Sequence, residues 1–248
     1  LSTYAYNRSG AYTLCADLSV IKPFEVRREF GISAVDVIIG GPPCQGFSVA
    51  GKRVIADKRN ELYKSFVDFV REFLPKAFVM ENVPTILTMG GGIIRDAIIS
   101  DFTELGYSIS YAVLMASHYG VPQNRRRAVF VGLKGGRKFE FPAATTIMPI
   151  TSEEAISDLP EKSLADCSPY PMPPQSKYQQ MLRNGSLGVY NHNVTQHTMR
   201  TQEIIAMVPD GGNYKNLPYD LWDTRKVHIA WTRLNSKRPS FTIDCGHN

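Results

Sequence analysis

The feature that most constrains the fold is a short apolar run that stops abruptly. Residues 35–39 read Val-Asp-Val-Ile-Ile, and Gly-Gly-Pro-Pro follows at 40–43. Such an ending predicts a strand that runs into a tight loop. A second apolar run, Ala77–Met80, ends at Glu-Asn-Val-Pro in residues 81–84. The chain is therefore expected to carry at least two strands with a loop after each.

Helical patterns separate these strands. Apolar residues recur every three or four positions in 61–74, at Leu62, Phe66, Phe69, Val70 and Phe73, which predicts a helix with one buried face. Three glycines precede a second helical stretch from Ile93 to about Leu105, and strand-like runs follow at 108–115 and 128–131. This alternation predicts an open α/β sheet with helices packed on its faces and ligands bound beyond the carboxyl ends of the strands.

Composition bounds the class of protein. With 248 residues, of which 43% are hydrophobic, the chain can form one large domain or a domain with a small appendage. It contains no apolar run of about 18 residues and no secretory signal at its start, so the default location is the cytoplasm. Its four cysteines form no C-x-x-C pair, so no metal site is expected. The net charge of +5 permits a polyanionic partner without establishing one.

The texture of the chain changes after about Phe141. Residues 166–193 are rich in Pro, Ser, Gln, Asn and Tyr without a sustained period, whereas residues 233–243 again have the character of ordered structure. We therefore expect an α/β domain over 1–145, a loop-rich appendage over 146–232, and a return to the first domain over 233–248.

The densest chemical signal is the segment 41–53, Gly-Pro-Pro-Cys-Gln-Gly-Phe-Ser-Val-Ala-Gly-Lys-Arg. Prolines fix the backbone, so a loop of this kind can present the sulfur of Cys44 in a set direction. A lone cysteine can instead be a small buried hydrophobic residue. The neighbouring motifs favour the reactive interpretation.

Two further motifs follow in order. Glu81 stands at the end of the second expected strand, and Arg125 and Arg127 lie two residues apart in an extended segment, so that both project to the same side. Alone, the glutamate could be solvated or cap a helix, and the arginines could form an ordinary charged surface. Their order and spacing relative to Cys44 make a functional constellation the better interpretation.

Together these segments resemble the DNA (cytosine-5) methyltransferases of the bacterial and archaeal modification-methylase type. That family is marked by a Pro-Cys-Gln loop (43–45 here), a Glu-Asn-Val strand end (81–83) and a Gln-x-Arg-x-Arg segment (123–127). Residues 57–62 and 233–243 resemble two further family motifs. The resemblance implies a Rossmann-like S-adenosylmethionine-dependent methyltransferase sheet, present in part, with a small recognition region.

The resemblance also implies a reaction. The Cys44 thiolate would add to carbon 6 of a cytosine flipped out of duplex DNA, and carbon 5 would then take a methyl group from S-adenosylmethionine. Glu81 would contact N3 and the exocyclic amine, Arg127 would contact O2, and Arg125 would support the loop. Carried over in the same way are the cofactor contacts Asp17, Pro43 and Leu62. The expected DNA contacts are Pro42, Gln45, Ser48, Lys52, Arg53 and Arg59.

Two family elements are not recognisable. We find neither the Phe-x-Gly-x-Gly cofactor loop before Tyr4 nor the last, Gly-Asn-Ser-Val motif. We therefore expect this chain to be a fragment, one half of a split enzyme completed by a second polypeptide, or part of a longer chain, and to bind the cofactor poorly alone. The expected partner is double-stranded DNA, bound by a monomer in the nucleoid-containing cytoplasm, as in a restriction-modification system.

Two other readings remain open. A tRNA cytosine-5 methyltransferase shares the Pro-Pro-Cys-Gln loop, but its usual Cys-Phe-Thr element is missing here. A non-catalytic DNA-binding relative would explain the missing cofactor loop but not the intact Cys44, Glu81 and Arg127.

Base-reading side chains are expected within 166–231, where the candidates are Asn191, His192, His197, Arg200 and the 211–213 turn.

Overall fold

The computed structural model describes residues 1–43, 61–224 and 231–243. These residues form two compact units, which are described separately. The first comprises Leu1–Leu114 and Arg126–Pro142, and the second comprises Met115–Arg125 and Ala143–Asn248.

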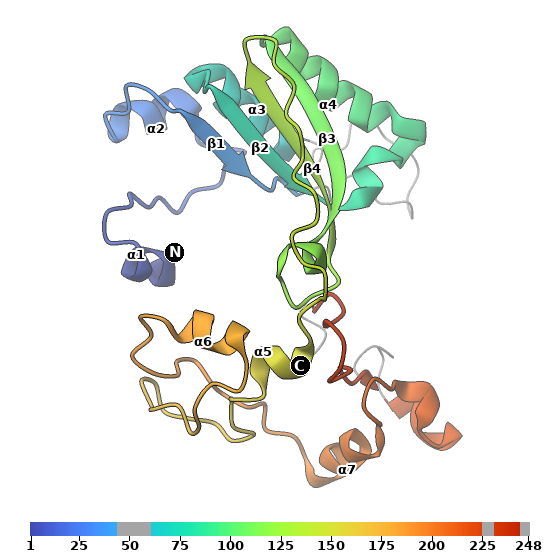
Figure 1. Cartoon of the computed structure of the whole chain (residues 1–248). Helices are drawn as coiled ribbons and strands as arrows, with labels where there is room; N and C mark the ends of the chain where they lie inside the picture. The colour runs from blue at the N-terminus through green and yellow to red at the C-terminus, as the bar shows by residue number, and fades with distance from the viewer. Residues whose placement is uncertain (44–60, 225–230, 244–248) are drawn as a thin grey trace. The chain divides into compact units, whose positions relative to one another are not determined.

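A four-stranded sheet organises the first unit (Figure 1). Its strands are β1 (Val37–Gly40), β2 (Ala77–Asn82), β3 (Tyr107–Met115) and β4 (Arg126–Lys134), in the spatial order β1-β2-β4-β3. Strand β2 pairs in parallel with β1 and antiparallel with β4. The α/β fold class predicted from the alternating pattern is therefore confirmed.

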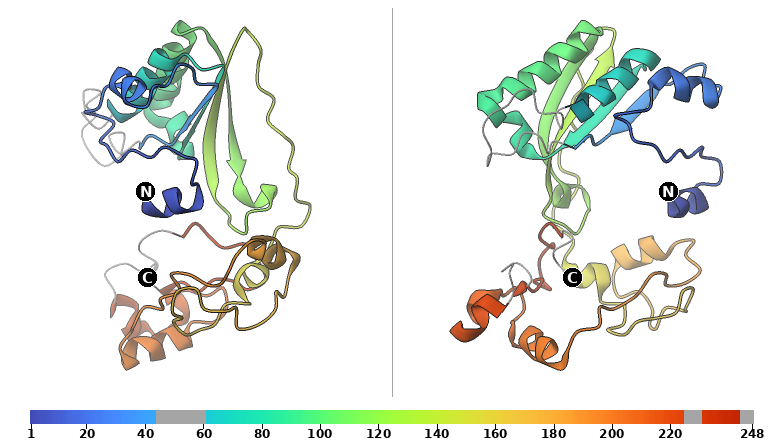
Figure 2. Two further views of the ribbon diagram at one scale, coloured as in Figure 1. Left: turned by 90° about the vertical axis from the view of Figure 1, so that its left-hand side faces the viewer. Right: turned by 180° about the vertical axis from the view of Figure 1, so that it is seen from behind.

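The helices of this unit are α1 (Ser2–Asn7), α2 (Pro23–Glu29), α3 (Glu61–Phe73) and α4 (Ile93–Glu104), and the short 3-10 helices η3 (Pro84–Leu87) and η4 (Met89–Gly92) precede α4. Helices α3 and α4 lie on the same face of the sheet (Figure 2). No helix of the described residues has both the length and the apolarity of a membrane span.

The core between sheet and helices is aromatic. The Phe78 ring of β2 is fully buried, with its centroid 6.0 Å from that of Phe66 on α3 and 4.1 Å from that of Phe102 on α4. Opposite Phe78 in the ladder stands Gly132, where any Cβ atom would lie 2.0 Å from the ring. Close packing of this kind fixes the register of β2 against β4.

The observed strands differ in extent from the expected ones. Strand β2 was expected to end at Met80, with Glu81 just past it, but it continues through Asn82. The reason is the antiparallel partner β4, which pairs Glu81 with Val129 and Asn82 with Ala128. A partner so distant in sequence leaves no local signal. Glu81 is therefore held within a strand.

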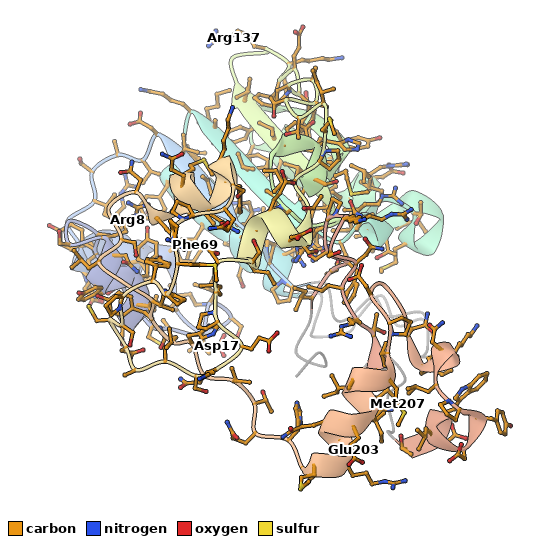
Figure 3. The ribbon with its side chains drawn as sticks, turned by 60° about the horizontal axis from the view of Figure 1, so that its bottom comes forward. Arg8, Asp17, Phe69, Arg137, Glu203 and Met207 are labelled. Carbon is orange, nitrogen blue, oxygen red and sulfur yellow. The ribbon has the colours of Figure 1, made fainter. Side chains whose placement is uncertain are left out.

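The second unit contains short helices around a smaller core. They are η5 (Ala116–Tyr119), α5 (Ser152–Ile156), α6 (Lys177–Arg183), α7 (Met199–Met207), η6 (Tyr214–Asn216) and η7 (Tyr219–Thr224). The exposed Met207 and its helix neighbour Glu203 are labelled on α7 in Figure 3. The buried residues of this core are Ile204, Val208, Leu217, Leu221 and Trp231.

Residues 233–243 tie parts of the second unit together by backbone hydrogen bonds. Ser152 N donates to Arg238 O at 2.9 Å, and Gly211 N donates to Leu234 O at 3.0 Å. Ser240 forms an isolated bridge with Gln123. The segment therefore links the start of α5, the 209–212 turn and the chain that precedes β4.

Candidate active site

An ion pair joins the predicted acid and the second arginine of the QxRxR segment. Nε of Arg127 lies 2.6 Å from Oε1 of Glu81. Both residues occupy the face of the sheet opposite the helices, because their neighbours Met80, Asn82 and Ala128 are the buried ones. The pair remains accessible, with 43% of the Glu81 side chain exposed and 21% of that of Arg127.

Exposed ion pairs contribute at most about 1 kcal/mol to stability, so this contact orients more than it stabilises. It holds the carboxylate toward β4 at an open face of the sheet. A planar guanidinium and a carboxylate side by side present donors and an acceptor to any flat heterocycle that enters. That is the chemistry required for recognising the edge of a pyrimidine base.

The loop that follows β1 approaches the same place. Asn82 Nδ2 donates a hydrogen bond of 2.8 Å to the Pro42 carbonyl oxygen. A Cβ atom on Gly41 would lie 3.3 Å from Oε2 of Glu81. The described part of this loop ends at Pro43, and the next residue in the sequence is Cys44.

Several predicted site residues lie outside the described residues. They are Cys44, Gln45, Ser48, Lys52, Arg53 and Arg59. Leu62 belongs to the first turn of α3, but its side chain is likewise not described. The expected roles of these residues stay predictions.

Arg125 lies in the second unit, whereas Arg127 lies in the first. The Arg125 backbone accepts a hydrogen bond from Ala116 N at 2.9 Å and donates one to Gln123 O at 2.9 Å. These bonds close a compact turn before β4. The supporting role predicted for Arg125 is compatible with this position, and it also stays a prediction.

Among the predicted cofactor contacts, Asp17 lies in the segment between α1 and α2 (Figure 3). Its Oδ1 accepts hydrogen bonds from Ser19 N at 2.9 Å and from Ser19 Oγ at 2.7 Å. The hydroxyl bond and then the backbone bond lower the pKa of the Asp17 carboxyl. The group is therefore an ionised, exposed acceptor. Pro43, the other predicted cofactor contact among the described residues, follows Pro42 at the end of the described loop.

In the second unit, two side chains of helix α6, those of Arg183 and Gln179, bind the surrounding chain. Arg183 forms an ion pair with the buried Asp158, and its guanidinium lies 3.8 Å from the ring centroid of Tyr170. Gln179 is buried and donates to Ser157 Oγ at 3.0 Å. Helix α6 also borders a surface hollow of about 700 Å³, lined by Pro174, Lys177, Gln180, Met181, Arg183 and Asn184.

Two of the suggested recognition residues, His192 and Asn191, differ in their local environment. Nε2 of His192 lies 2.7 Å from the Pro160 carbonyl oxygen, a contact that serves the local fold. Asn191 adopts a left-handed backbone with φ of 54°. Lys177, Gln180 and Asn184 were not predicted as recognition residues, although their spacing of three and four residues is the pattern of one helical face.

Asn82 was also missed as an individual residue. It stood only as the middle of the Glu-Asn-Val motif, and nothing in its local sequence indicates that its amide bonds a carbonyl group 40 residues earlier.

Comparison with known proteins identifies relatives of this chain. The model of a family described as C-5 cytosine-specific DNA methylase matches residues 1–237. Type II methyltransferase M.DdeI of Desulfomicrobium norvegicum is 40% identical over 227 residues, which are 87% of this chain and 54% of that protein. Type II methyltransferase M1.HphI of Haemophilus parahaemolyticus is 35% identical over 244 residues, covering 97% and 60%. The chain thus spans somewhat more than half the length of these relatives.

A solved structure shares the fold. It is described as a DNA modification methyltransferase encoded within a prophage of E. coli, and it matches with a TM-score of 0.74 and 24% identity. The match covers 97% of this chain and 72% of that one. At this identity the likeness is evidence for the fold alone.

Proposed function

Since the chain belongs to the C-5 cytosine-specific DNA methylases, we propose that it carries the catalytic residues for methylating carbon 5 of cytosine in duplex DNA. The observation that carries the proposal is the convergence of the Glu81–Arg127 pair with the loop that leads to Cys44. The whole reaction, its substrate and its partners are part of the proposal.

Cys44 acts as the nucleophile. Carbon 5 of cytosine is a weak nucleophile, and addition of a thiolate at carbon 6 converts it into an enamine-like carbon. The bond from sulfur to carbon 6 forms while the ring electrons move toward N3. After the methyl group has been added, the proton on carbon 5 leaves and the bond to sulfur breaks, which restores the aromatic ring and the free cysteine.

Glu81 and Arg127 hold the base during this sequence. Glu81 protonates N3 or holds the proton there, and it accepts a hydrogen bond from the exocyclic amine. Arg127 donates a hydrogen bond to O2. Their placement supports these roles, because the two side chains lie 2.6 Å apart on one open face of the sheet. The base must leave the helix to reach them, at a cost of a few kcal/mol.

S-adenosylmethionine, when bound, supplies the electrophilic methyl group. The described residues fit part of this cofactor, because Asp17 offers an exposed, ionised carboxylate that can accept hydrogen bonds from the cofactor's polar groups. Pro43 and Leu62 are the other proposed contacts.

The rest of the cofactor site comes from a complementing segment, either covalently joined or on a second polypeptide. Ile39 of β1 is 76% exposed and Val37 is 48% exposed, on the face opposite the core residue Ile38. Among the described strands β1 also stands at an edge of the sheet. An exposed apolar edge strand favours pairing with further structure. The greater length of the relatives supports the same conclusion.

DNA recognition is proposed to reside in residues 146–232, between catalytic residues 1–145 and the returning segment 233–248. Along the hollow beside α6, Lys177 is available for phosphates, and Gln180 and the C-cap residue Asn184 are available for base edges. Pro42, Gln45, Ser48, Lys52, Arg53 and Arg59 are proposed to contact DNA near the target base. The protein acts as a monomer on DNA in the nucleoid.

The test is methyl transfer to DNA. The protein, as this chain and as its full-length gene product, is incubated with radiolabelled S-adenosylmethionine and duplex DNA, and the labelled nucleoside is identified by chromatography. We expect 5-methyldeoxycytidine, its loss in Cys44→Ser and its retention in the control Cys15→Ser, whose cysteine is exposed. DNA binding without transfer by either product would instead identify a non-catalytic relative.

A further inference from the structure

Asn82 makes two hydrogen bonds at the end of β2, one with each end of its amide. Its Nδ2 donates to the Pro42 carbonyl at 2.8 Å, and its Oδ1 accepts from Val83 N at 2.9 Å. The residue is 5% exposed. An amide this buried, with a donor and an acceptor both engaged, is fixed in one orientation.

The bond to Pro42 lies where the backbone can no longer hold the two chains together. The β1–β2 ladder ends with the pair Gly40 and Met80. Beyond it, Pro42 and Pro43 have no N–H group with which to continue donating to β2. The side chain of Asn82 therefore takes over the connection between the strands, two residues past the last pair.

The bond also fixes the loop beside Glu81, its neighbour in sequence. A Cβ atom on Gly41 would approach Oε2 of Glu81 to 3.3 Å, so the loop already lies close to the carboxylate. Cys44 follows Pro42 by two residues, a Cα–Cα distance of at most about 7.6 Å. The Asn82 amide therefore holds the last described part of the loop that leads to Cys44.

We propose that Asn82 is a positioning residue, which holds the start of the loop that leads to the Cys44 nucleophile beside Glu81. This inference rests on the proposed function and adds a residue that touches neither the base nor the cofactor. Asn82 acts through its hydrogen bond to the Pro42 carbonyl oxygen, which holds the start of the loop that leads to Cys44. Glu81, the adjacent residue, holds the base.

The test measures attack on cytosine without the methyl donor. Addition of the thiolate at carbon 6 lets carbon 5 take a proton from water, so a tritium atom on carbon 5 is released when the adduct collapses. The assay follows tritium release from duplex DNA containing [5-³H]cytosine, and DNA affinity and melting temperature are measured beside it. It uses the full-length gene product.

Asn82→Asp is the informative variant, because it keeps the shape and the acceptor for Val83 N but loses the donor to Pro42. We expect tritium release to fall about 100-fold, as for a misplacement near 1 Å, with DNA affinity unchanged. The matched control is Asn7→Asp, which removes an equivalent donor to the Thr3 carbonyl on exposed α1 and should leave the rate unchanged.

The pH dependence separates positioning from general damage. Burial raises the pKa of a carboxyl group placed at position 82, so it takes up a proton as the pH falls and regains an O–H donor for Pro42. The ratio of wild-type to Asn82→Asp rates should therefore shrink at lower pH, whereas the ratio for Asn82→Ala should stay constant. Asn82→Ala also replaces the aspartate variant as the rate test if the latter does not fold.

Three results would overturn the inference. The first is an unchanged release rate in a folded Asn82 variant, and the second is a loss of rate matched by an equal loss of DNA affinity. The third is a ratio for Asn82→Asp that does not respond to pH. Failure of the proposed function has a different signature, since the wild-type protein would then release no tritium, and the inference would fall with it.

Discussion

Gly132 is a position where a very small chemical change should cost substantial stability. The β2–β4 register sets it opposite Phe78, and a Cβ atom there would lie 2.0, 2.5 and 2.7 Å from three carbons of the ring. The ring cannot retreat, because Phe66, Phe102 and Tyr107 surround it at centroid distances of 6.0, 4.1 and 5.3 Å.

Gly132→Ala should therefore force the ring or the strand to move. Overpacking of this kind costs about 1–3 kcal/mol, and a loss of ~2 kcal/mol lowers the melting temperature of a protein of this size by roughly 4–8 °C. The assay is urea unfolding followed by circular dichroism, with Gly10→Ala as the control. Gly10 has no atom within 4 Å of an added Cβ and should tolerate the change.

A double-mutant cycle adds a second check. Phe78→Leu shortens the side chain that meets the new methyl group, so Gly132→Ala should cost less in that background than in the wild type. Stability of Gly132→Ala within about 0.5 kcal/mol of wild type, the range of ordinary surface changes, would refute the register. The same register brings Glu81 beside Arg127, so the core experiment also tests the geometry of the site.

Three further changes have defined outcomes. Glu81→Gln should lower methyl transfer by about 100-fold or more, because proton transfer at N3 is lost, while DNA affinity measured by fluorescence anisotropy stays constant; equal losses in both would contradict the assigned role. Asp158→Asn should cost about 3 kcal/mol in urea unfolding, since it leaves Arg183 without its buried partner, whereas Asp68→Asn, in an exposed pair, should cost less than about 1 kcal/mol. Burial raises the pKa of Tyr107 to about 12 from 10.0, so its stabilising contribution is complete below pH 10 and is lost as the pH rises toward 12; Tyr107→Phe should show a shallower loss of stability over that range, and identical profiles would count against this assignment.

Much of the first unit could be predicted because its signals are local. The apolar face of 61–74 and the Gly-Pro stop after residue 39 are each contained in one short, continuous stretch of sequence. Helix α3 and strand β1 appear where those patterns place them. The α/β class follows from their order along the chain. The family followed from three short motifs, each of which keeps its residues adjacent in sequence.

Contacts between distant residues could not be predicted in the same way. The extension of β2 to Asn82 depends on β4, which begins 44 residues after β2 ends. The bond from Asn82 to Pro42 and the buried pair of Asp158 and Arg183 likewise join residues 40 and 25 positions apart. Periodicity reports which face of an element is apolar, not which side chain of another element will meet it.

The most direct measurement of the central claim is a trapped covalent intermediate. Duplex DNA containing 5-fluorocytosine cannot release the enzyme after methyl transfer, because fluorine replaces the proton that must leave carbon 5. The full-length gene product is incubated with this DNA and S-adenosylmethionine, digested, and mapped by mass spectrometry. We expect one adduct, on the peptide that contains Cys44. An adduct on another residue, or none from a folded protein that binds DNA, would contradict it.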